Sequence, residues 1–134
     1  MNTTYFLNLA AGNLLRTQIT PAIPAKLYIG LSSTEPTLAG GNVNEPASGA
    51  GYARVELTSL SAPTNGVVTN TTSIDFNEST AAWGTMTHYV IYDAANDGNL
   101  LMFGALSTSR TVEPATIMTI KAGSLNISVV NPAA

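Results

Sequence analysis

The sequence WGTMTHYVIYDAANDGNLLMFGAL, residues 83–106, contains the pattern that decides the fold. Residues 85–93 predict a long strand with apolar or aromatic side chains on both faces, which is typical of a central strand. Residues 96–99, Asn-Asp-Gly-Asn, predict a hairpin turn, because these residue types tolerate the positive φ of a tight turn. Residues 100–106 follow as the next strand.

Further strand patterns lie on both sides of this hairpin. They are residues 26–31, 52–57, 67–69, 74–76, 116–121 and 125–129. We expect Arg54 and Glu56 to lie side by side on the outer face of their strand, and Gly123 to join the last two strands as a hairpin. About seven strands with regularly spaced turns predict a mainly β fold, a single antiparallel β-sandwich or jelly roll.

One helix is predicted at the N-terminus, over residues 3–16. Thr3 or Thr4 can cap its first amides. Two apolar stripes run along it, Phe6-Leu9-Ala10-Asn13 and Leu7-Ala11-Leu14-Leu15. Together they are wider than a surface helix on a small domain needs. Such a helix either covers one end of the β core or also docks on a neighbouring subunit.

Residues 32–51 show almost no apolar periodicity and contain several Gly and Pro residues. A loop of ~20 residues in a small domain is usually functional or mobile, so we expect it to reach towards a partner. The chain is thus predicted as one domain, 1–134, with a helix at 3–16 and a β-sandwich at 25–129. The predicted subunit-interface residues are Tyr5, Phe6, Leu9, Leu38 and Val43.

Charge is scarce in this chain. Charged residues make up 10% of it, against about 25% in an ordinary soluble domain. The exterior is therefore either covered by hydroxyls and amides or partly hidden against other subunits. A nucleic-acid partner is not expected, because the net charge is −3 and the basic residues are scattered. No membrane span is expected, since no window of ~18 residues is continuously apolar.

Residues suited to catalysis or metal binding are few. The chain has no cysteine and one histidine, His88, for which we expect a hydrogen bond to a strand neighbour. The oxygens of residues 93–99 lack the pattern of a helix-loop-helix calcium site and suit a turn instead. Asp75 and Glu78 could form a carboxylate pair only in a cleft, which short strands seldom build. We therefore predict no catalytic residue, no metal and no cofactor.

Three aromatic residues, Trp83, Tyr89 and Tyr92, allow two interpretations. They could form a stacking platform for sugars, or they could pack in the core and at a subunit interface. The low aromatic content of 7% favours packing.

Four blocks of sequence occur in serial order, at residues 28–36, 49–55, 83–94 and 98–106. Together they resemble a family of small phage virion proteins. The family is often labelled tail fibre protein, and it is similar in kind to head decoration or cement proteins. The resemblance covers residues ~1–129 and implies a structural role without catalytic residues.

These observations predict a non-enzymatic structural protein of the phage virion, assembled in the host cytoplasm. It would bind major capsid or tail proteins in many copies, with homo-oligomers expected. The chain lacks the repetitive body of a fibre shaft, which favours decoration or cement over fibre. A receptor- or glycan-binding module is the alternative function.

Overall fold

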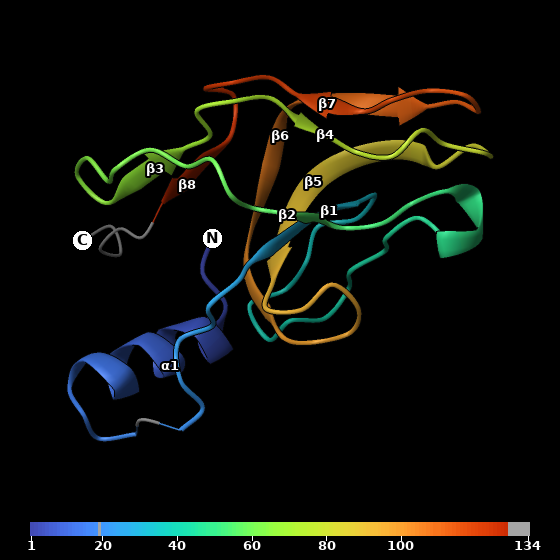
Figure 1. The fold of residues 1–134 in the computed structure, drawn as a ribbon. Coiled ribbons are helices and arrows are strands. Elements are labelled where there is room, and N and C mark those ends of the chain that lie inside the picture. Colours follow the sequence, from blue (N-terminus) through green and yellow to red (C-terminus); the bar gives the residue numbers. More distant parts are fainter. Residues whose placement is uncertain (19, 129–134) are drawn as a thin grey trace.

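A computed structural model describes residues 1–18 and 20–128 (Figure 1). The predicted fold class is confirmed: these residues are mainly β and antiparallel, with one α-helix. The jelly-roll form stays a prediction. The elements are α1 (Thr4–Leu14), β1 (Tyr28–Ser32), the 3-10 helix η1 (Ser48–Ala50), β2 (Val55–Glu56), β3 (Val67–Thr69), β4 (Ile74–Asp75), β5 (Gly84–Tyr92), β6 (Leu100–Val112), β7 (Thr119–Ile120) and β8 (Asn126–Ser128).

A four-stranded sheet with the order β2-β1-β5-β6 forms one layer. The predicted hairpin at residues 83–106 supplies a central strand, β5, and an edge strand, β6, and the turn follows its sequence, with positive φ at Asp97 and Gly98. Two two-stranded ribbons form a second layer; in Figure 1, β4-β7 lies above the sheet and β3-β8 lies to its left. Between these layers lies the main core, to which Ile29, Met86 and Ile120 contribute.

The other face of the sheet carries a smaller buried cluster of Val90, Tyr92, Leu100 and Phe103. Val43 of the 32–51 segment packs against it. Both faces of the β5-β6 hairpin are therefore buried near its turn, over residues 89–92 and 100–103, which explains the nearly continuous apolar sequence there. The 32–51 segment is held together by backbone hydrogen bonds, among them Ser33 N–H to the Asn44 carbonyl at 3.1 Å.

The predicted C-terminal hairpin is wrong. Gly123 does turn the chain with a φ of +78°, but the strands on either side pair with different partners. In β7, Ile120 pairs with Ile74 of β4, whereas in β8 Ile127 pairs with Val68 of β3. Strands of two or three residues have too few local bonds to select a partner, so tertiary packing selects it. Val129, the predicted last strand residue, lies outside the described residues.

Several strand boundaries differ from the prediction, and β2 and β6 are the clearest cases. Only Val55–Glu56 of the 52–57 segment joins the sheet, because Tyr52 turns into the core. There its ring stacks on Phe76 with centroids 6.3 Å apart and meets Trp83 edge-on at 5.4 Å. By contrast, β6 extends six residues past the predicted end at Leu106, to Val112.

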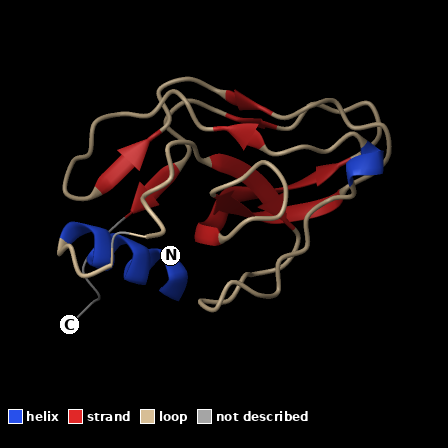
Figure 2. Cartoon of the chain, turned by 60° about the horizontal axis from the view of Figure 1, so that its bottom comes forward, coloured by secondary structure: helices blue, strands red, loops and turns tan. Residues whose placement is uncertain are grey.

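Helix α1 lies at one end of the molecule in both Figure 1 and Figure 2. Thr3 is its N-cap, as predicted, and accepts a hydrogen bond from the Phe6 N–H. The Thr3 hydroxyl also donates to the Leu100 carbonyl at 2.7 Å, which ties the helix to β6. The helix ends at Leu14, before the predicted Arg16, which has a positive φ of 62°.

Candidate functional site

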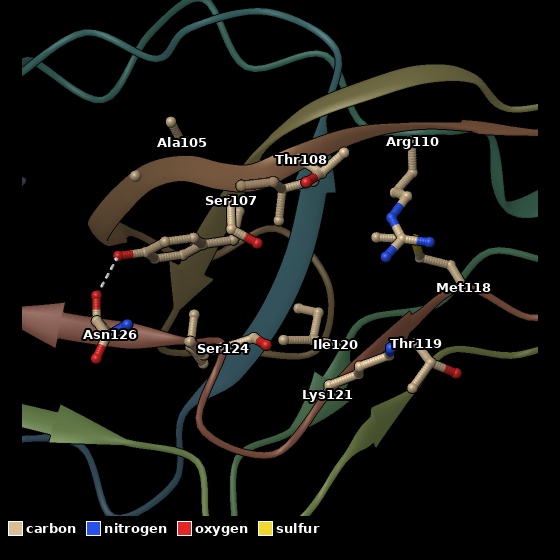
Figure 3. A pocket seen from close by; sticks show the side chains of 14 residues that line it. Ala105, Ser107, Thr108, Arg110, Met118, Thr119, Ile120, Lys121, Ser124 and Asn126 are labelled. Carbon is tan, nitrogen blue, oxygen red and sulfur yellow. Dashed lines mark hydrogen bonds between the residues drawn. The ribbon is translucent and has the colours of Figure 1, made fainter.

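A cavity of about 400 Å³ lies between the second half of β6 and the segment that contains β7 and β8 (Figure 3). One wall consists of β6, and Met118 to Asn126 provide the other. Its polar lining contains Ser107, Thr108, Arg110, Thr119, Lys121, Ser124 and Asn126. Its apolar lining contains Leu106, Met118, Ile120 and Leu125.

A bulge in β6 shapes this cavity. Met86 pairs with Arg110 and His88 pairs with Ala105, so Thr87 alone lies opposite the four residues 106–109. The extra residues lift this part of β6 out of the regular ladder. Leu106 packs against the core, whereas the 107–109 side chains are exposed. The bulge therefore displays hydroxyl groups at the cavity.

Tyr89 lies at the base of the cavity, where its hydroxyl donates to the Asn126 carbonyl at 3.2 Å. Its ring covers Gly104, since a Cβ at that position would lie 2.7 Å from the Tyr89 Cε1 atom. Burial raises the pKa of the Tyr89 hydroxyl above its ordinary value, so the Tyr89 side chain in the cavity is neutral at pH 7.

Two of the five basic residues, Arg110 and Lys121, line the same cavity. Figure 3 shows the Arg110 side chain reaching from β6 towards the segment that carries Lys121. Within residues 1–18 and 20–128, neither has a carboxylate within 4.0 Å or donates a side-chain hydrogen bond to protein. The prediction that the basic residues are scattered is wrong for this pair, because β6 and β7 bring them to one cavity.

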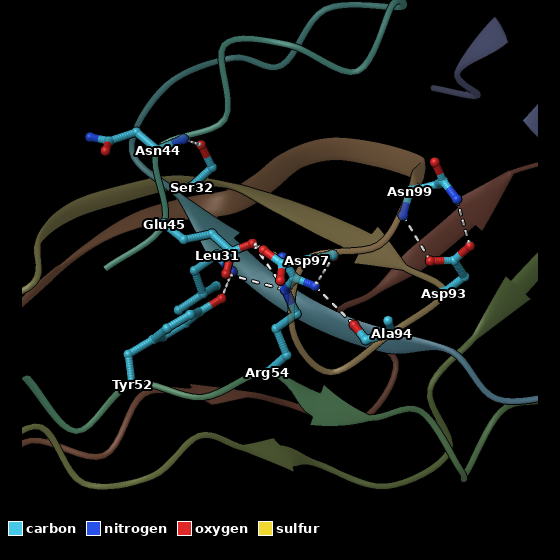
Figure 4. Close-up of polar contacts among 10 residues, drawn as sticks. All are labelled: Leu31, Ser32, Asn44, Glu45, Tyr52, Arg54, Asp93, Ala94, Asp97 and Asn99. Atoms are coloured by element: carbon cyan, nitrogen blue, oxygen red, sulfur yellow. Dashed lines mark hydrogen bonds and ion pairs between the residues drawn. The ribbon is translucent and has the colours of Figure 1, made fainter. Parts of the chain in front are cut away.

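Arg54, in contrast to Arg110 and Lys121, binds several protein groups. Its guanidinium binds Glu45 through two nitrogens, with Nη2 2.8 Å from Oε1 and Nε 3.0 Å from Oε1. It also donates to the carbonyls of Ala94 and Asp97, both at 2.8 Å (Figure 4). The guanidinium carbon lies 3.6 Å from the centroid of the Tyr92 ring. The Arg54 side chain is 9% exposed.

We call Arg54, Glu45 and Tyr92 the Arg54 cluster. It joins the 32–51 segment to the β5-β6 turn, and every donor group named above has a protein acceptor. Arg54 thus lies with Tyr92 on the face away from the main core, as its predicted outer-face position requires, but Glu45 and the β5-β6 turn cover it there. Glu56 instead lies 3.9 Å from Lys26 in an exposed ion pair. The Arg54 cluster is a structural contact with little capacity for a ligand.

An apolar surface covers the outer side of α1. Leu7, Leu14 and Leu15 are 51%, 80% and 69% exposed. They share a stripe with Ala11, because residues seven and eight positions apart return to the same side of a helix. α1 itself has no charged residue. Among the described residues, most of the large exposed hydrophobic side chains precede residue 40; they are Met1, Leu7, Leu14, Leu15, Ile23, Leu38 and Ile117.

The predicted interface residues lie mostly elsewhere. Leu9 is buried in the main core, with Tyr5 and Phe6 packed against it, and Val43 covers the smaller cluster. Leu38 is 48% exposed, and its carbonyl accepts the Thr4 N–H. Two of the predicted interface residues, Phe6 and Leu9, thus belong to the inward stripe of α1. The second predicted stripe is the exposed one.

The other candidate residues have structural surroundings. Trp83, Tyr89 and Tyr92 are buried, and Trp83 donates to the Ala50 carbonyl at 2.9 Å, so they form no exposed stacking platform. His88 Nδ1 is 2.8 Å from the Thr87 hydroxyl, as predicted. Asp93 accepts from Asn99 within the predicted turn.

Carboxylates do not gather into a larger cluster in the part of the chain that is described. There, no three His, Asp or Glu side chains are grouped so that they could hold a metal ion. Asp75 instead accepts a 2.7 Å hydrogen bond from Thr119. In the described part of the chain, no helix combines the length and the apolar character that crossing a membrane requires, and α1 has 11 residues.

Comparison with known proteins supports the resemblance found in the sequence. No curated protein matches the chain. A family model described as "Podophage GP4 fiber I protein gp80" matches residues 2–128, which include every described helix and strand. The match therefore covers the helix, the four-stranded sheet and both ribbons. The chain therefore belongs to the Podophage GP4 fiber I protein gp80 family, a family of phage fibre proteins.

Proposed function

We propose that this virion component is a non-enzymatic fibre subunit that docks on neighbouring virion proteins through the outer side of α1. The observation that carries the proposal is the exposed stripe Leu7-Ala11-Leu14-Leu15. Exposed apolar patches rimmed by polar residues are typical of protein interfaces. The occupant is a neighbouring fibre or tail chain, because the family is one of fibre proteins.

The scarcity of charge supports this assignment. A charge that enters an interface loses its hydration, and an unpaired one costs free energy. α1 has no charged residue, and the one that follows it, Arg16, is exposed at its C-terminal end. The stripe can therefore be covered without burying an ion. Assembly in many copies would multiply a modest affinity per contact.

Binding to phage particles that lack this protein tests the proposal. Purified chain is mixed with such particles, and bound protein is measured after sedimentation. We expect saturable binding by the native chain. The double variant Leu14→Gln and Leu15→Gln should bind at least about tenfold more weakly, since it removes two apolar side chains from the contact.

Ile117→Gln provides the matched control, because Ile117 is a similarly exposed apolar residue that lies outside α1. It should bind like the native chain. Equal binding by all three proteins would contradict docking through α1. Light scattering on the free chain tests the predicted homo-oligomer separately.

Head decoration is the second candidate function. It is favoured by the absence of a repeated body among the described elements, which form one sheet and two short ribbons. Particles with and without tails separate the two roles. Uptake by tailless heads would favour decoration, whereas uptake that needs the tail would favour the fibre role.

A further inference from the structure

We propose that the cavity between β6 and the β7–β8 segment binds an anionic saccharide, with Arg110 and Lys121 holding its acidic group. This goes beyond the proposed docking through α1, and it uses a different part of the molecule. Of the three aromatic residues that the sequence suggested for sugar binding, Trp83 and Tyr92 do not line this cavity and Tyr89 does, so the polar contacts to the saccharide would come from other residues.

The first argument is the charge at the cavity. The chain has a net charge of −3, yet two of its five cations line one cavity of about 400 Å³. Lys26 and Arg54 each have a carboxylate partner. Arg110 and Lys121 have none within the described residues, so their positive charge is available to a ligand. Charge-assisted hydrogen bonds to a carboxylate, sulfate or phosphate are about twice as strong as neutral ones.

The second argument is the distribution of polar groups. Arg110 and Lys121 also line an adjoining cavity of about 160 Å³, whereas Ser107, Ser124 and Asn126 line only the larger one. The cations therefore lie at the shared end, and the hydroxyl and amide groups lie along the rest. This order matches an acidic group attached to a polyhydroxylated ring.

The third argument is that these polar groups have no role in holding the fold. Many Ser, Thr and Asn side chains elsewhere are engaged, such as Ser79 with the Glu113 carbonyl and Asn70 with Lys121 and Leu125. Among the described residues, the hydroxyls of Ser107, Thr108 and Ser124 make no protein hydrogen bond. The β6 bulge that displays two of them is a kind of irregularity common beside binding sites.

Size and apolar lining complete the match. A volume of about 400 Å³ lies within the range of about 300–1,000 Å³ for small-molecule sites. Leu106, Met118 and Ile120 offer apolar contact to the C–H faces of a sugar ring. A nucleic acid would need a longer basic face than two cations provide. A short acidic peptide from another subunit remains an outcome of the test.

Titration calorimetry and amide chemical-shift mapping on the full chain test the proposal. The probes are a galacturonic acid disaccharide, the neutral galactose disaccharide and inorganic phosphate. We expect saturable binding of the acidic disaccharide, with shifts confined to residues 104–110 and 118–126. The other two probes should bind at least about tenfold more weakly, and added salt should weaken the binding.

Arg110→Gln and Lys121→Gln should each reduce affinity for the acidic disaccharide by about tenfold or more. The matched controls Arg16→Gln and Lys26→Gln remove the same charges outside the cavity and should have little effect. Because all four residues are exposed, their variants are expected to fold, which amide spectra verify. This test leaves α1 unaltered, so its result is independent of the docking proposal.

Three outcomes would overturn the proposal. The first is an absence of saturable binding by the acidic disaccharide. The second is equal loss in the cavity variants and the control variants, which would indicate net charge alone. The third is that phosphate, or an acidic peptide such as tetraglutamate, binds at least as tightly as the acidic disaccharide, which would exclude a contribution from the sugar ring.

Discussion

Arg54 shows how a single residue can replace the contacts that a longer strand would have made. The 52–57 segment contributes only two residues to the sheet, and Arg54 precedes them. Its side chain links Glu45, two carbonyls of the β5-β6 turn and the Tyr92 ring. One buried cation thus connects its own segment with the 32–51 segment and with the β5-β6 hairpin.

Replacing Arg54 should destabilise the protein strongly. Arg54→Met leaves the Glu45 carboxylate, 18% exposed, without its partner, and we expect the free energy of unfolding to fall by about 3–5 kcal/mol. Arg54→Lys should recover only part of this, since an ammonium cannot bind through two parallel nitrogens. Urea denaturation monitored by tryptophan fluorescence measures both changes.

Lys26→Met is the control for this measurement. Its ion pair with Glu56 is exposed and 3.9 Å long, so its loss should change stability by less than about 1 kcal/mol. If Arg54→Met and Lys26→Met proved equally mild, the Arg54 cluster would have no stabilising role.

Among the elements, β6 lies at the edge of the four-stranded sheet, and the two halves of its outer edge have different neighbours. Next to Leu101 and Phe103 the edge is occupied by the N-terminal residues: Thr3 N–H donates to the Leu101 carbonyl at 2.9 Å, and the Phe103 N–H donates to Met1. Beyond Gly104 the bulge opens the cavity. The first part of the edge thus positions α1, and the second part displays polar side chains.

Thr3 connects these elements, so its substitution should loosen α1. Thr3→Ala removes the N-cap and the hydroxyl contacts with Leu100 and Leu101. We expect a loss of about 1–2 kcal/mol in stability and faster hydrogen exchange at the amides of α1. Thr3→Ser keeps the hydroxyl and should retain most of the protection. Unchanged exchange in Thr3→Ala would show that apolar contacts alone hold the helix.

At the scale of the whole molecule, the core combines apolar packing with buried tyrosines. Tyr52 and Tyr89 belong to the main core and Tyr92 to the smaller cluster. Burial raises the pKa of all three, and for Tyr92 the nearby Glu45 raises it further while Arg54 lowers it. The folded state therefore favours the neutral form of each of these tyrosines over the ionised form.

Stability should consequently fall at alkaline pH. A pKa that is higher in the folded than in the unfolded state contributes stability that is complete below the ordinary value of 10.0 and is lost as pH rises above it. We expect the free energy of unfolding to decline above pH 10, by up to about 1.4 kcal/mol per pH unit for each tyrosine. Urea denaturation between pH 7 and pH 11 measures the slope.

Tyr52→Phe tests the origin of that slope. It should reduce the decline, although at pH 7 it costs about 1–3 kcal/mol, because the buried Leu31 N–H loses its acceptor at 3.1 Å. Tyr28→Phe at the start of β1 is the control. A slope that is the same in Tyr52→Phe and the native chain would exclude ionisation of Tyr52 as a cause.

The sequence by itself determined the features that depend on neighbouring residues. Asp97-Gly98 adopts the positive φ that its predicted turn requires, and Thr3 caps the helix as predicted. The apolar run around residues 85–93 identified the central strand, since both of its faces are buried. These features are local because a turn, a cap or a buried strand is specified by a few consecutive side chains.

Only the tertiary structure decided which distant segments meet. It paired β7 with β4 and β8 with β3, bound Arg54 to Glu45, and brought Arg110 and Lys121 to one cavity. Short strands and single charges have no periodicity that names a partner, so packing of the two layers selects among several possible pairings. The polar run at residues 107–111 is the sequence signal for the cavity. Its meaning depends on the β6 bulge, because the bulge places these side chains at the cavity.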